Sequence, residues 1–204
     1  MLLKIHPETP QKNYIQDIAK IIKDGGIIIF PTDSVYGLGC DIYNTAAAEK
    51  VAKLKGLKLK KADFSFLFDD ISMVTNYTKP LPNGTFKLLK KNTPGPFTFI
   101  LEANSEIPQI FRKSKKTLGV RIPDNRIIQE LIKEVGNPIL TTSIKDENDI
   151  VEYTSDPTLI YEKYEHHVDA VIDGGYGNNV ASAVVDCTDG KVEVLREGVE
   201  PLKE

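Results

Sequence analysis

The apolar and polar residues of this chain alternate between a helical and an extended repeat. Ile15, Ile18, Ala19 and Ile22 are spaced as one face of a helix. Short apolar runs bounded by glycine, proline or polar turns predict buried strands. The expected helices lie between Pro10 and Asp24, at 45–55, 71–77, 84–91 and 127–135, and from Pro157 onward. The expected strands lie at 27–30, 64–68, 97–101, 118–122, 139–142, 168–172, 184–187 and 192–195.

Helices interleaved with strands predict an α/β fold with a mixed sheet. The last two strands flank Asp189-Gly190, a pair of residues typical of a β-hairpin turn. At 204 residues the chain is long enough to bury a core of its own, so we expect a single domain over residues 1–204. The acidic stretch 145–152 is expected to be a surface loop.

The composition is that of an ordinary globular protein, with 41% apolar and 27% charged residues. The longest purely apolar run, Ile27 to Phe30, is far shorter than the ~20 residues that a membrane-spanning helix needs. The first residues contain no segment typical of a signal peptide. Cys40 and Cys187 form no C-x-x-C pair and are too few for a disulfide or zinc framework. We therefore expect a cytoplasmic protein without membrane association.

The net charge of −3 conceals an asymmetry along the chain. Residues 1–144 hold 21 Lys and Arg against 14 Asp and Glu, and residues 145–204 hold 5 against 15. The two basic clusters are Lys50, Lys53, Lys55, Lys58, Lys60 and Lys61, and Arg112, Lys113, Lys115 and Lys116. Such clusters attract the phosphates of a nucleotide or of RNA. A solvated helix face or loop is the alternative interpretation, and we favour it for the second cluster.

The densest group of polar side chains follows the first of these expected strands. The sequence there is PTDSVYGLGCD, residues 31–41, with three hydroxyls and a carboxylate within Thr32–Tyr36. Because α/β proteins bind ligands at the ends of their strands, this segment is a candidate binding loop. From the residues alone, a polar turn followed by a Gly-Leu-Gly packing bend is equally consistent with it.

The common phosphate-loop, dinucleotide and nucleophile-elbow motifs are absent from the sequence, and its three histidines lack metal-ligand spacing. Arg121 and Arg196 lie in or at the end of apolar strands, where a guanidinium can clamp a phosphate or a carboxylate. Each is equally consistent with a salt bridge at a rim. Thr98, Ser143 and Ser182 are hydroxyls on or beside strands, and each alone is more often structural.

Seven segments carry a resemblance to a known family: PTDSVYGLGCD at 31–41, PGPFTFIL at 94–101, GVRIPDN at 119–125, PILTTS at 138–143, DGGYG at 173–177, ASAVVD at 181–186 and LREG at 195–198. On these segments the chain resembles the YrdC-like family, which includes the threonylcarbamoyl-AMP synthases of tRNA modification. LKKADFSFLFDDISMV and SIKDEN are most similar to the YciO branch. The resemblance implies a twisted, open mixed sheet with helices on both sides and a concave, basic groove.

The resemblance also implies a reaction and its partners. The synthases of this family condense L-threonine, bicarbonate and ATP into threonylcarbamoyl-AMP and pyrophosphate. Mg²⁺ accompanies ATP as part of the substrate, and no tightly bound cofactor is expected. Double-stranded RNA binding is also attributed to the family, so tRNA or double-stranded RNA is a further expected partner.

The matching motifs assign roles to particular residues. Thr32 and Tyr36 would line the threonine pocket, and Lys55 would contact the ATP phosphates as the lysine of the family's K-x-R element; these three are the expected catalytic residues. Ser143 would match the serine of the S-x-N element. The other expected binding residues are Lys58, Thr98, Arg121, Ser182 and Arg196, and no residue is expected to bind a metal.

Two positions depart from the family pattern. Leu57 stands where K-x-R has its arginine, and Lys145 stands where S-x-N has its asparagine. Loss of a bidentate arginine removes a charge-assisted contact of ~1.5–3 kcal/mol, and a lysine cannot reproduce its planar fork. The leading hypothesis is therefore a nucleotide-binding enzyme of the synthase type, with weakened activity or a shifted substrate.

Two other functions compete with this hypothesis. One is a non-catalytic module that binds double-stranded RNA or tRNA, which the basic part of the chain favours. Its acidic C-terminal part would then have to lie away from the groove. The other is an enzyme that uses carbamoyl phosphate or carbamoylates a different amine.

Overall fold

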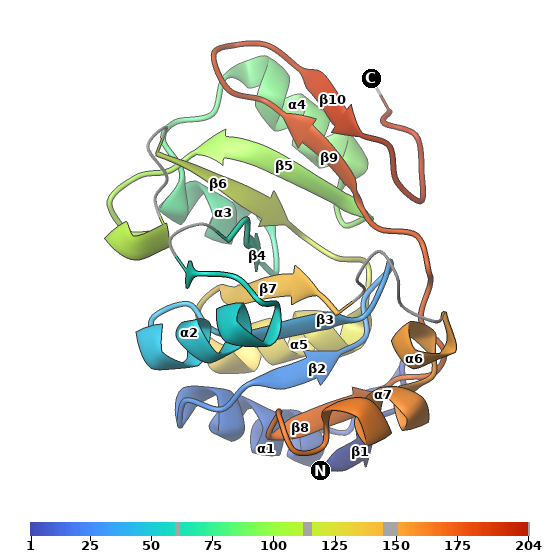
Figure 1. Cartoon of the computed structure of the whole chain (residues 1–204). Helices are drawn as coiled ribbons and strands as arrows, with labels where there is room; N and C mark the ends of the chain where they lie inside the picture. Colours follow the sequence, from blue (N-terminus) through green and yellow to red (C-terminus); the bar gives the residue numbers. More distant parts are fainter. Residues whose placement is uncertain (60–61, 112–115, 145–150, 204) are drawn as a thin grey trace.

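In the computed structural model, residues 1–59, 62–111, 116–144 and 151–203 are described, and they form a ten-stranded mixed sheet with helices on both faces (Figure 1). The strands are β1 (Leu2–Lys4), β2 (Ile28–Phe30), β3 (Gly37–Asp41), β4 (Ser65–Leu67), β5 (Phe97–Glu102), β6 (Thr117–Arg121), β7 (Ile139–Ser143), β8 (Ala170–Asp173), β9 (Ala183–Asp186) and β10 (Glu193–Arg196). The helices are α1 (Lys12–Lys23), α2 (Thr45–Leu54), α3 (Ile71–Tyr77), α4 (Asn83–Asn92), α5 (Arg126–Val135), α6 (Glu152–Ser155) and α7 (Pro157–Tyr164), with a short 3₁₀ helix at Gln109–Phe111. The expected α/β class is confirmed.

The strands are ordered β1-β8-β2-β3-β7-β4-β6-β5-β9-β10 across the sheet. The short strand β4 joins two halves, because it pairs antiparallel with β7 on one side and parallel with β6 on the other. Figure 1 shows the two halves turned relative to each other, with β5, β6, β9 and β10 in one and β2, β3, β7 and β8 in the other. This twist places strand ends from distant parts of the sequence around one region.

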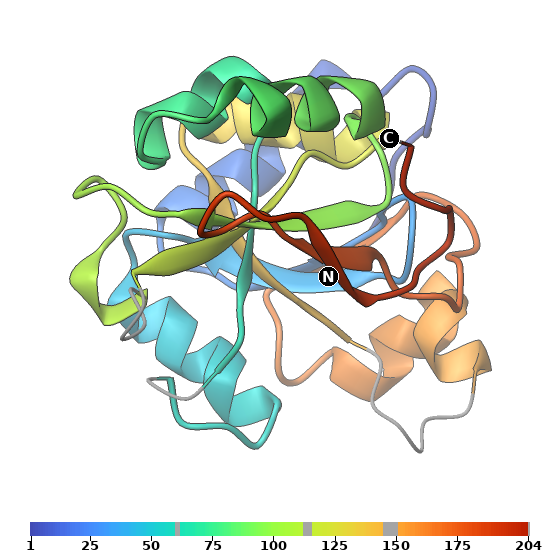
Figure 2. The ribbon, with the colours of Figure 1, turned by 90° about the horizontal axis from the view of Figure 1, so that it is seen from above.

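Helices cover the two faces of the sheet unequally. Figure 2 shows α1, α3, α4 and α5 on one face and α2, α6 and α7 on the other. The fully buried Ile18 and Ile22 of α1 pack with Ile128 and Leu131 of α5 in one core cluster. Each such side chain contributes about 1.5–3 kcal/mol of hydrophobic free energy. Among the described residues, no helix is long and apolar enough to cross a membrane.

Local sequence signals set several element ends. The Asn125 side chain caps α5 by accepting a hydrogen bond from the Ile128 N–H at 3.2 Å, and Gly136 ends that helix with φ +87°. Asp156 caps α7 through the Thr158 N–H at 2.8 Å. Asp189 and Gly190 both have positive φ between the antiparallel β9 and β10, so the hairpin is confirmed.

The segment Gly37-Leu38-Gly39 is not a packing bend but the start of strand β3, which pairs antiparallel with both β2 and β7. A Cβ added to Gly39 would lie 2.3 Å from the carbonyl oxygen of Leu140, so glycine is what allows the strands to approach. Strands β1 and β3 were not predicted. The partner of β1 is β8, far away in the sequence, and β3 begins with Gly37-Leu38-Gly39, which carries no strand signal of its own. The stretch expected to be an acidic loop overlaps α6 at Glu152, while residues 145–150 lie outside the described residues.

Candidate functional site

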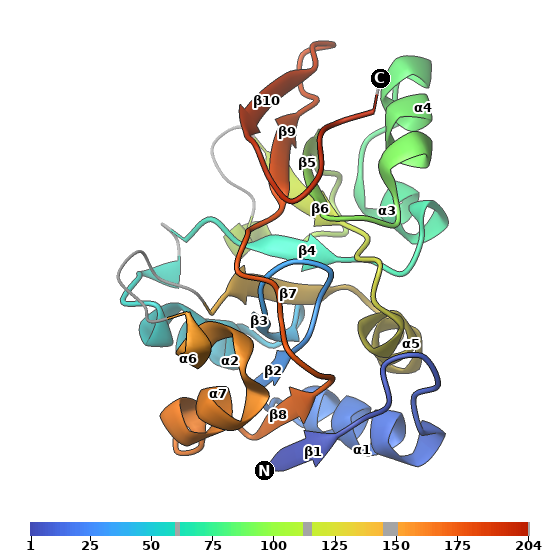
Figure 3. The same cartoon turned by 90° about the vertical axis from the view of Figure 1, so that its right-hand side faces the viewer.

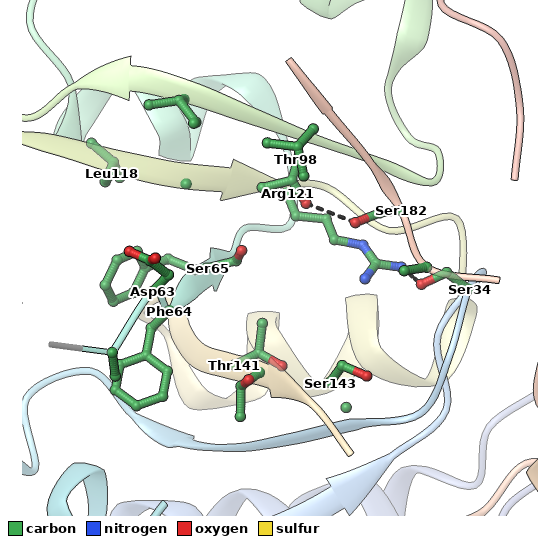
Figure 4. Close-up of a pocket in the computed structure, with 18 of the residues that line it drawn as sticks. Ser34, Asp63, Phe64, Ser65, Thr98, Leu118, Arg121, Thr141, Ser143 and Ser182 are labelled. Atoms are coloured by element: carbon green, nitrogen blue, oxygen red, sulfur yellow. Dashed lines mark hydrogen bonds between the residues drawn. The ribbon is translucent and has the colours of Figure 1, made fainter. Parts of the chain in front are cut away.

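A cavity of about 480 Å³ lies between the two halves of the sheet. Its walls come from β3, β4, β5, β6, β7, β9 and β10, and from the loops that precede β3 and β4. Figure 4 shows Asp63, Phe64 and Leu118 at one end and Arg121, Ser34 and Ser182 at the other. The cavity therefore combines an apolar end with an end rich in hydrogen-bond donors, a pattern typical of small-molecule sites.

Arg121 is the most firmly held side chain of the polar end. It is the last residue of β6 and is 7% exposed. Its Nη2 donates to Thr32 Oγ1 at 2.9 Å and to Ser34 Oγ at 2.8 Å, and is ion-paired with Asp33. The other carboxylate oxygen of Asp33 accepts a hydrogen bond from the Asp124 N–H at 2.7 Å. The binding loop after β2 therefore holds the guanidinium in place.

One nitrogen of this guanidinium is unsatisfied by the described protein. Arg121 Nε is buried and has no hydrogen-bond partner among the described residues. A buried, charged N–H without an acceptor is energetically costly. Arg121 lines the cavity, but its Nε is shielded from it, so a carboxylate or phosphate oxygen bound there would satisfy Nε only after the side chains around it shift.

Arg196 brings a second positive charge to the same end. The pairing of β9 and β10 shifts between Val194 and Arg196, so Leu195 is an extra residue and the bulge turns Leu195 and Arg196 toward the cavity. Arg196 Nε and Nη2 donate to the carbonyl oxygen of Ser182 at 3.1 and 2.7 Å. Burial lowers the pKa of Arg196 and the nearby positive charge of Arg121 lowers it further, so an anion between them would be strongly favoured.

Hydroxyl groups surround the two arginines. Thr98 Oγ1 and Ser182 Oγ, both buried, are hydrogen-bonded at 3.0 Å and tie β5 to the chain before β9. Figure 4 places the side chains of Ser65, Thr141 and Ser143 along the opposite wall, on β4 and β7. Such hydroxyls both donate and accept, so they suit a ligand with several polar atoms.

Tyr36 closes the cavity behind the binding loop. Its hydroxyl donates to the carbonyl oxygen of Gly175 at 2.6 Å and accepts from the Gly174 N–H at 3.4 Å. Burial raises the pKa of Tyr36 above its ordinary value, so the phenol stays protonated. A Cβ on Gly177 would lie 2.5 Å from the Tyr36 ring, so the loop after β8 packs directly on it. Tyr36 is therefore fixed as a neutral wall of the cavity.

The tertiary structure brings most of the residues singled out in the sequence to one place. Tyr36, Thr98, Arg121, Ser143, Ser182 and Arg196 all line the cavity. Thr32 is not in the lining but holds Arg121 from behind, and its hydroxyl donates to the carbonyl oxygen of Val35 at 2.8 Å.

The two lysines expected at the phosphates are not in the cavity lining. Lys55 is the C-terminal capping residue of α2, and Lys58 is exposed. Leu59, one residue after Lys58, does line the cavity, so this lysine-bearing segment leads to the apolar end. Leu57 is 46% exposed, and Lys145 lies outside the described residues.

Other cavity residues were not predicted as site residues. Asp33 and Ser34 belong to the loop that the sequence singled out, but only the fold shows that they hold Arg121. Thr141 belongs to the PILTTS segment, and Asp63 and Phe64 precede β4 without any motif that marks them. The alternation of side chains between the two faces of β4 and β7 was the sequence signal that could have identified Ser65 and Thr141 as site residues.

The described residues offer little to a metal ion. No group of three or more His, Cys, Asp or Glu among them could hold one. Asp63 is the carboxylate of the described cavity lining.

The fold is α/β, and its cavity is lined by two arginines and several hydroxyl groups. A protein-family model whose description is "Telomere recombination", the Sua5/YciO/YrdC model, matches residues 20–198. The chain is 38% identical to YciO of Escherichia coli K12 over 201 residues, which cover 98% of this chain and 96% of YciO. It is 35% identical to the threonylcarbamoyl-AMP synthase of Nitrosococcus oceani over 125 residues, which cover 61% of this chain and 67% of that protein.

Solved structures show the same similarity. The crystal structure of E. coli YciO superposes with a TM-score of 0.91 over all of this chain and 98% of that chain. The structure of P. abyssi Sua5 complexed with L-threonine superposes with a TM-score of 0.88 at 26% identity, over 99% of this chain and 58% of that chain. The chain belongs to the Sua5/YciO/YrdC family.

Proposed function

We propose that this protein is a nucleotide-binding enzyme of the threonylcarbamoyl-AMP synthase type. Its substrates would be L-threonine or a related amino acid, bicarbonate and ATP, and its products threonylcarbamoyl-AMP and pyrophosphate. The observation that carries the proposal is the unpartnered, buried Nε of Arg121, next to the second guanidinium of Arg196. Two cations at the polar end of the cavity suit a carboxylate and a phosphate together.

The comparisons support an amino acid as one substrate. A structure of P. abyssi Sua5, which has the same fold, holds L-threonine. In this chain, Arg121 Nε has no acceptor among the described residues and would bind the substrate carboxylate once the side chains around it shift. Thr32, Asp33 and Ser34 already hold Nη2 of that guanidinium, so its direction is set before the ligand arrives.

The first chemical step would form a carbamate. The amine nitrogen of the amino acid attacks the carbon of bicarbonate and forms a new N–C bond. The C–OH bond of bicarbonate breaks, and the hydroxyl leaves as water with a proton from the amine. No covalent protein intermediate is needed. The cavity walls, including Tyr36 and the hydroxyls of Thr141 and Ser143, would orient the two reactants and exclude water that would return the carbamate to bicarbonate.

The second step would transfer the adenylyl group. A carbamate oxygen attacks the α-phosphorus of ATP, the bond between the α-phosphorus and the bridging oxygen breaks, and pyrophosphate leaves. Negative charge on the phosphates would be stabilised by Arg196, whose guanidinium lies on the cavity wall. Lys55 and Lys58 lie outside the cavity lining, on the segment before Leu59, and would attract the pyrophosphate portion from there. Mg²⁺ would enter as part of the ATP substrate.

The departures at Leu57 and Lys145 bear on how strong this activity is. The family's K-x-R arginine is absent, and the side chain of Leu57 is instead 46% exposed. Without that fork, we expect weaker binding of ATP rather than a different fold or cavity. A second consequence of the altered site would be a substrate amino acid other than threonine.

The test is pyrophosphate release by the purified protein with ATP, magnesium and bicarbonate, with and without L-threonine. We expect release that depends on threonine, with threonylcarbamoyl-AMP detected by mass spectrometry. Arg196→Gln should lower this activity roughly tenfold or more, because it removes a charge-assisted contact. Arg126→Gln, which changes an exposed arginine on α5 outside the cavity lining, is the matched control and should retain full activity.

Other outcomes of the same assay separate the competing functions. Release with carbamoyl phosphate but not with bicarbonate would replace the synthase proposal with the carbamoyl-transfer alternative. ATP binding without release under any of these conditions would mean that the substrate differs from threonine. Neither release nor ATP binding would overturn the proposal and favour an RNA-binding module.

One observation weighs against RNA in the cavity itself. An RNA-binding groove required the acidic part of the chain to lie elsewhere, yet Ser182, Val184 and Leu195 from that part line the cavity. Specific RNA binding would appear as an affinity that falls steeply with salt. We expect weak binding with little salt dependence, measured with a double-stranded RNA probe.

A further inference from the structure

The C-terminal segment, residues 197–203, follows directly after Arg196 and returns across the molecule. Figure 3 shows it leaving β10, passing the beginning of β9 and ending beside α4. This segment contains no residue of the cavity lining. Both ends of this segment nevertheless contact other parts of the protein, and these contacts affect the position of Arg196.

The first contact lies two residues after Arg196. A Cβ added to Gly198 would lie 2.0 Å from the Ala183 nitrogen and 2.6 Å from the Ser182 carbonyl carbon. The backbone of Gly198 therefore lies directly on the peptide whose carbonyl oxygen accepts both hydrogen bonds from Arg196. The Ser182–Ala183 peptide is thus held between the Arg196 side chain and the Gly198 backbone.

The second contact is a polar clamp at the far end of the segment. Asn92, the last residue of α4, is 2% exposed. Its Oδ1 accepts a hydrogen bond from the Lys203 N–H at 2.9 Å, and its Nδ2 donates to the Lys203 carbonyl oxygen at 2.8 Å and to the Leu88 carbonyl oxygen at 2.8 Å. The amide thus forms three bonds in a buried position, and it ties the end of the chain to α4.

The clamp matters because two positive charges lie close together at this site. The Arg196 guanidinium lies near that of Arg121. Partial burial lowers the pKa of Arg196, and the positive charge of Arg121 lowers it further. The two cations repel each other while the cavity holds no anion. Arg196 also lies on an exposed edge strand whose pairing is broken by a bulge, so β10 alone holds it weakly.

We infer that Asn92 is a positioning residue for Arg196: it anchors the C-terminal segment, which keeps the Arg196 guanidinium on the Ser182 carbonyl oxygen and aimed into the cavity. The inference deepens the proposed function. Its ligand-binding test depends on that proposed function, whereas its hydrogen-exchange test does not. It assigns a role in the site to a residue that touches no part of the cavity.

The direct test measures hydrogen exchange at the Nε–H of Arg196, which is hydrogen-bonded to Ser182. The chain has four arginines, so their Nε signals can be resolved by ¹H–¹⁵N NMR. In Asn92→Ala we expect exchange at Arg196 to accelerate about tenfold, because two hydrogen bonds to the segment are lost. Exchange at the exposed Arg126 is the internal reference and should not change.

Asn104→Ala is the matched control variant. Asn104 also ties backbone segments together, through Nδ2 to the carbonyl oxygens of Asn76 and Thr78 at 2.8 and 3.2 Å. It should leave Arg196 exchange unchanged. Lys203→Pro offers an independent disruption, because it removes the N–H that Asn92 accepts while leaving α4 intact. Unaltered Arg196 exchange in a folded Asn92→Ala or Lys203→Pro protein would overturn the inference.

A double-mutant cycle tests the consequence for ligand binding. Asn92→Ala should weaken ATP binding about tenfold in the native background and have no effect in an Arg196→Ala background. An equal loss in both backgrounds would show that Asn92 acts through general stability and would overturn the inference. If the native protein does not bind ATP, the proposed function fails while the exchange experiment still decides the role of Asn92.

Discussion

The carboxylate of Asp33 is ion-paired with the guanidinium of Arg121, and the two side chains are only 10% and 9% exposed. The pair joins the loop after β2 to the end of β6, 88 residues later. Removing two charges from water is expensive, and the pair is tolerated because Thr32, Ser34 and the Asp124 N–H add further hydrogen bonds. The ion pair therefore determines both the stability of the site and the direction of its central cation.

Breaking this pair should destabilise the fold. Asp33→Asn leaves the Arg121 guanidinium buried without its counter-charge, and we expect the free energy of unfolding to fall by about 3–5 kcal/mol. Urea denaturation measures the change. Glu130→Gln, which breaks an exposed ion pair with Lys133, is the control and should change stability by less than about 0.5 kcal/mol. A loss below about 1 kcal/mol for Asp33→Asn would show that solvent or the hydroxyls compensate for the missing carboxylate.

Two glycines with different surroundings should respond oppositely to the same substitution. Gly39→Ala places a methyl group 2.3 Å from the Leu140 carbonyl oxygen and should cost about 3 kcal/mol or more, because both β3 and β7 must shift. Gly84→Ala has no atom within 4 Å of the new carbon and lies in the first turn of α4, so it should stabilise by about 0.4–1 kcal/mol. Thermal unfolding of both variants measures these two changes in stability. Similar effects at the two positions would contradict the close approach of β3 and β7.

Stability should decline at alkaline pH. Burial, with a smaller contribution from the charge of Asp41, raises the pKa of Cys40 from 9.0 to about 12. Above pH 9 the unfolded thiol loses its proton while the folded thiol keeps it, so the folded state binds more protons and stability falls as pH rises. The slope for one such group is about 1.4 kcal/mol per pH unit.

Cys40→Ala isolates this contribution. Under reducing conditions, the variant should lose stability between about pH 9 and pH 11 less steeply than the native protein, by about 1.4 kcal/mol per pH unit. Cys187, whose pKa burial raises to about 11, contributes a second decline that both proteins share. Identical slopes would show that Cys40 is not protected from solvent.

Restoring the arginine of the K-x-R element should strengthen nucleotide binding. Leu57 is 46% exposed, so Leu57→Arg can be made with little effect on the fold. If ATP binds as proposed, its affinity should rise roughly tenfold to a hundredfold, because a bidentate, charge-assisted contact is added. Leu57→Lys supplies the charge without the fork and should give a smaller gain. Isothermal titration with ATP and magnesium compares the three proteins, and equal affinities would exclude this position from phosphate binding.

Local patterns in the sequence were sufficient for most secondary structure. The apolar stripe that ends at Val135, followed by Gly136, predicted α5, because a helix needs only neighbours three or four residues away and a residue that ends it. Strand β3 escaped prediction because Gly37 and Gly39 are poor strand formers in isolation. Their extended conformation depends on β2 and β7, and β7 lies about a hundred residues later in the sequence.

On its own, the sequence showed that the chain carries a set of hydroxyls and arginines at strand ends, and six of the residues singled out there line the cavity. The tertiary structure alone decided what each arginine meets. It paired Arg121 with Asp33, left Arg121 Nε without an acceptor among the described residues, and anchored the segment behind Arg196 at Asn92. These relationships join residues 88 or more positions apart. They arise from strand order and sheet twist, which depend on long-range packing rather than on any local pattern of residues.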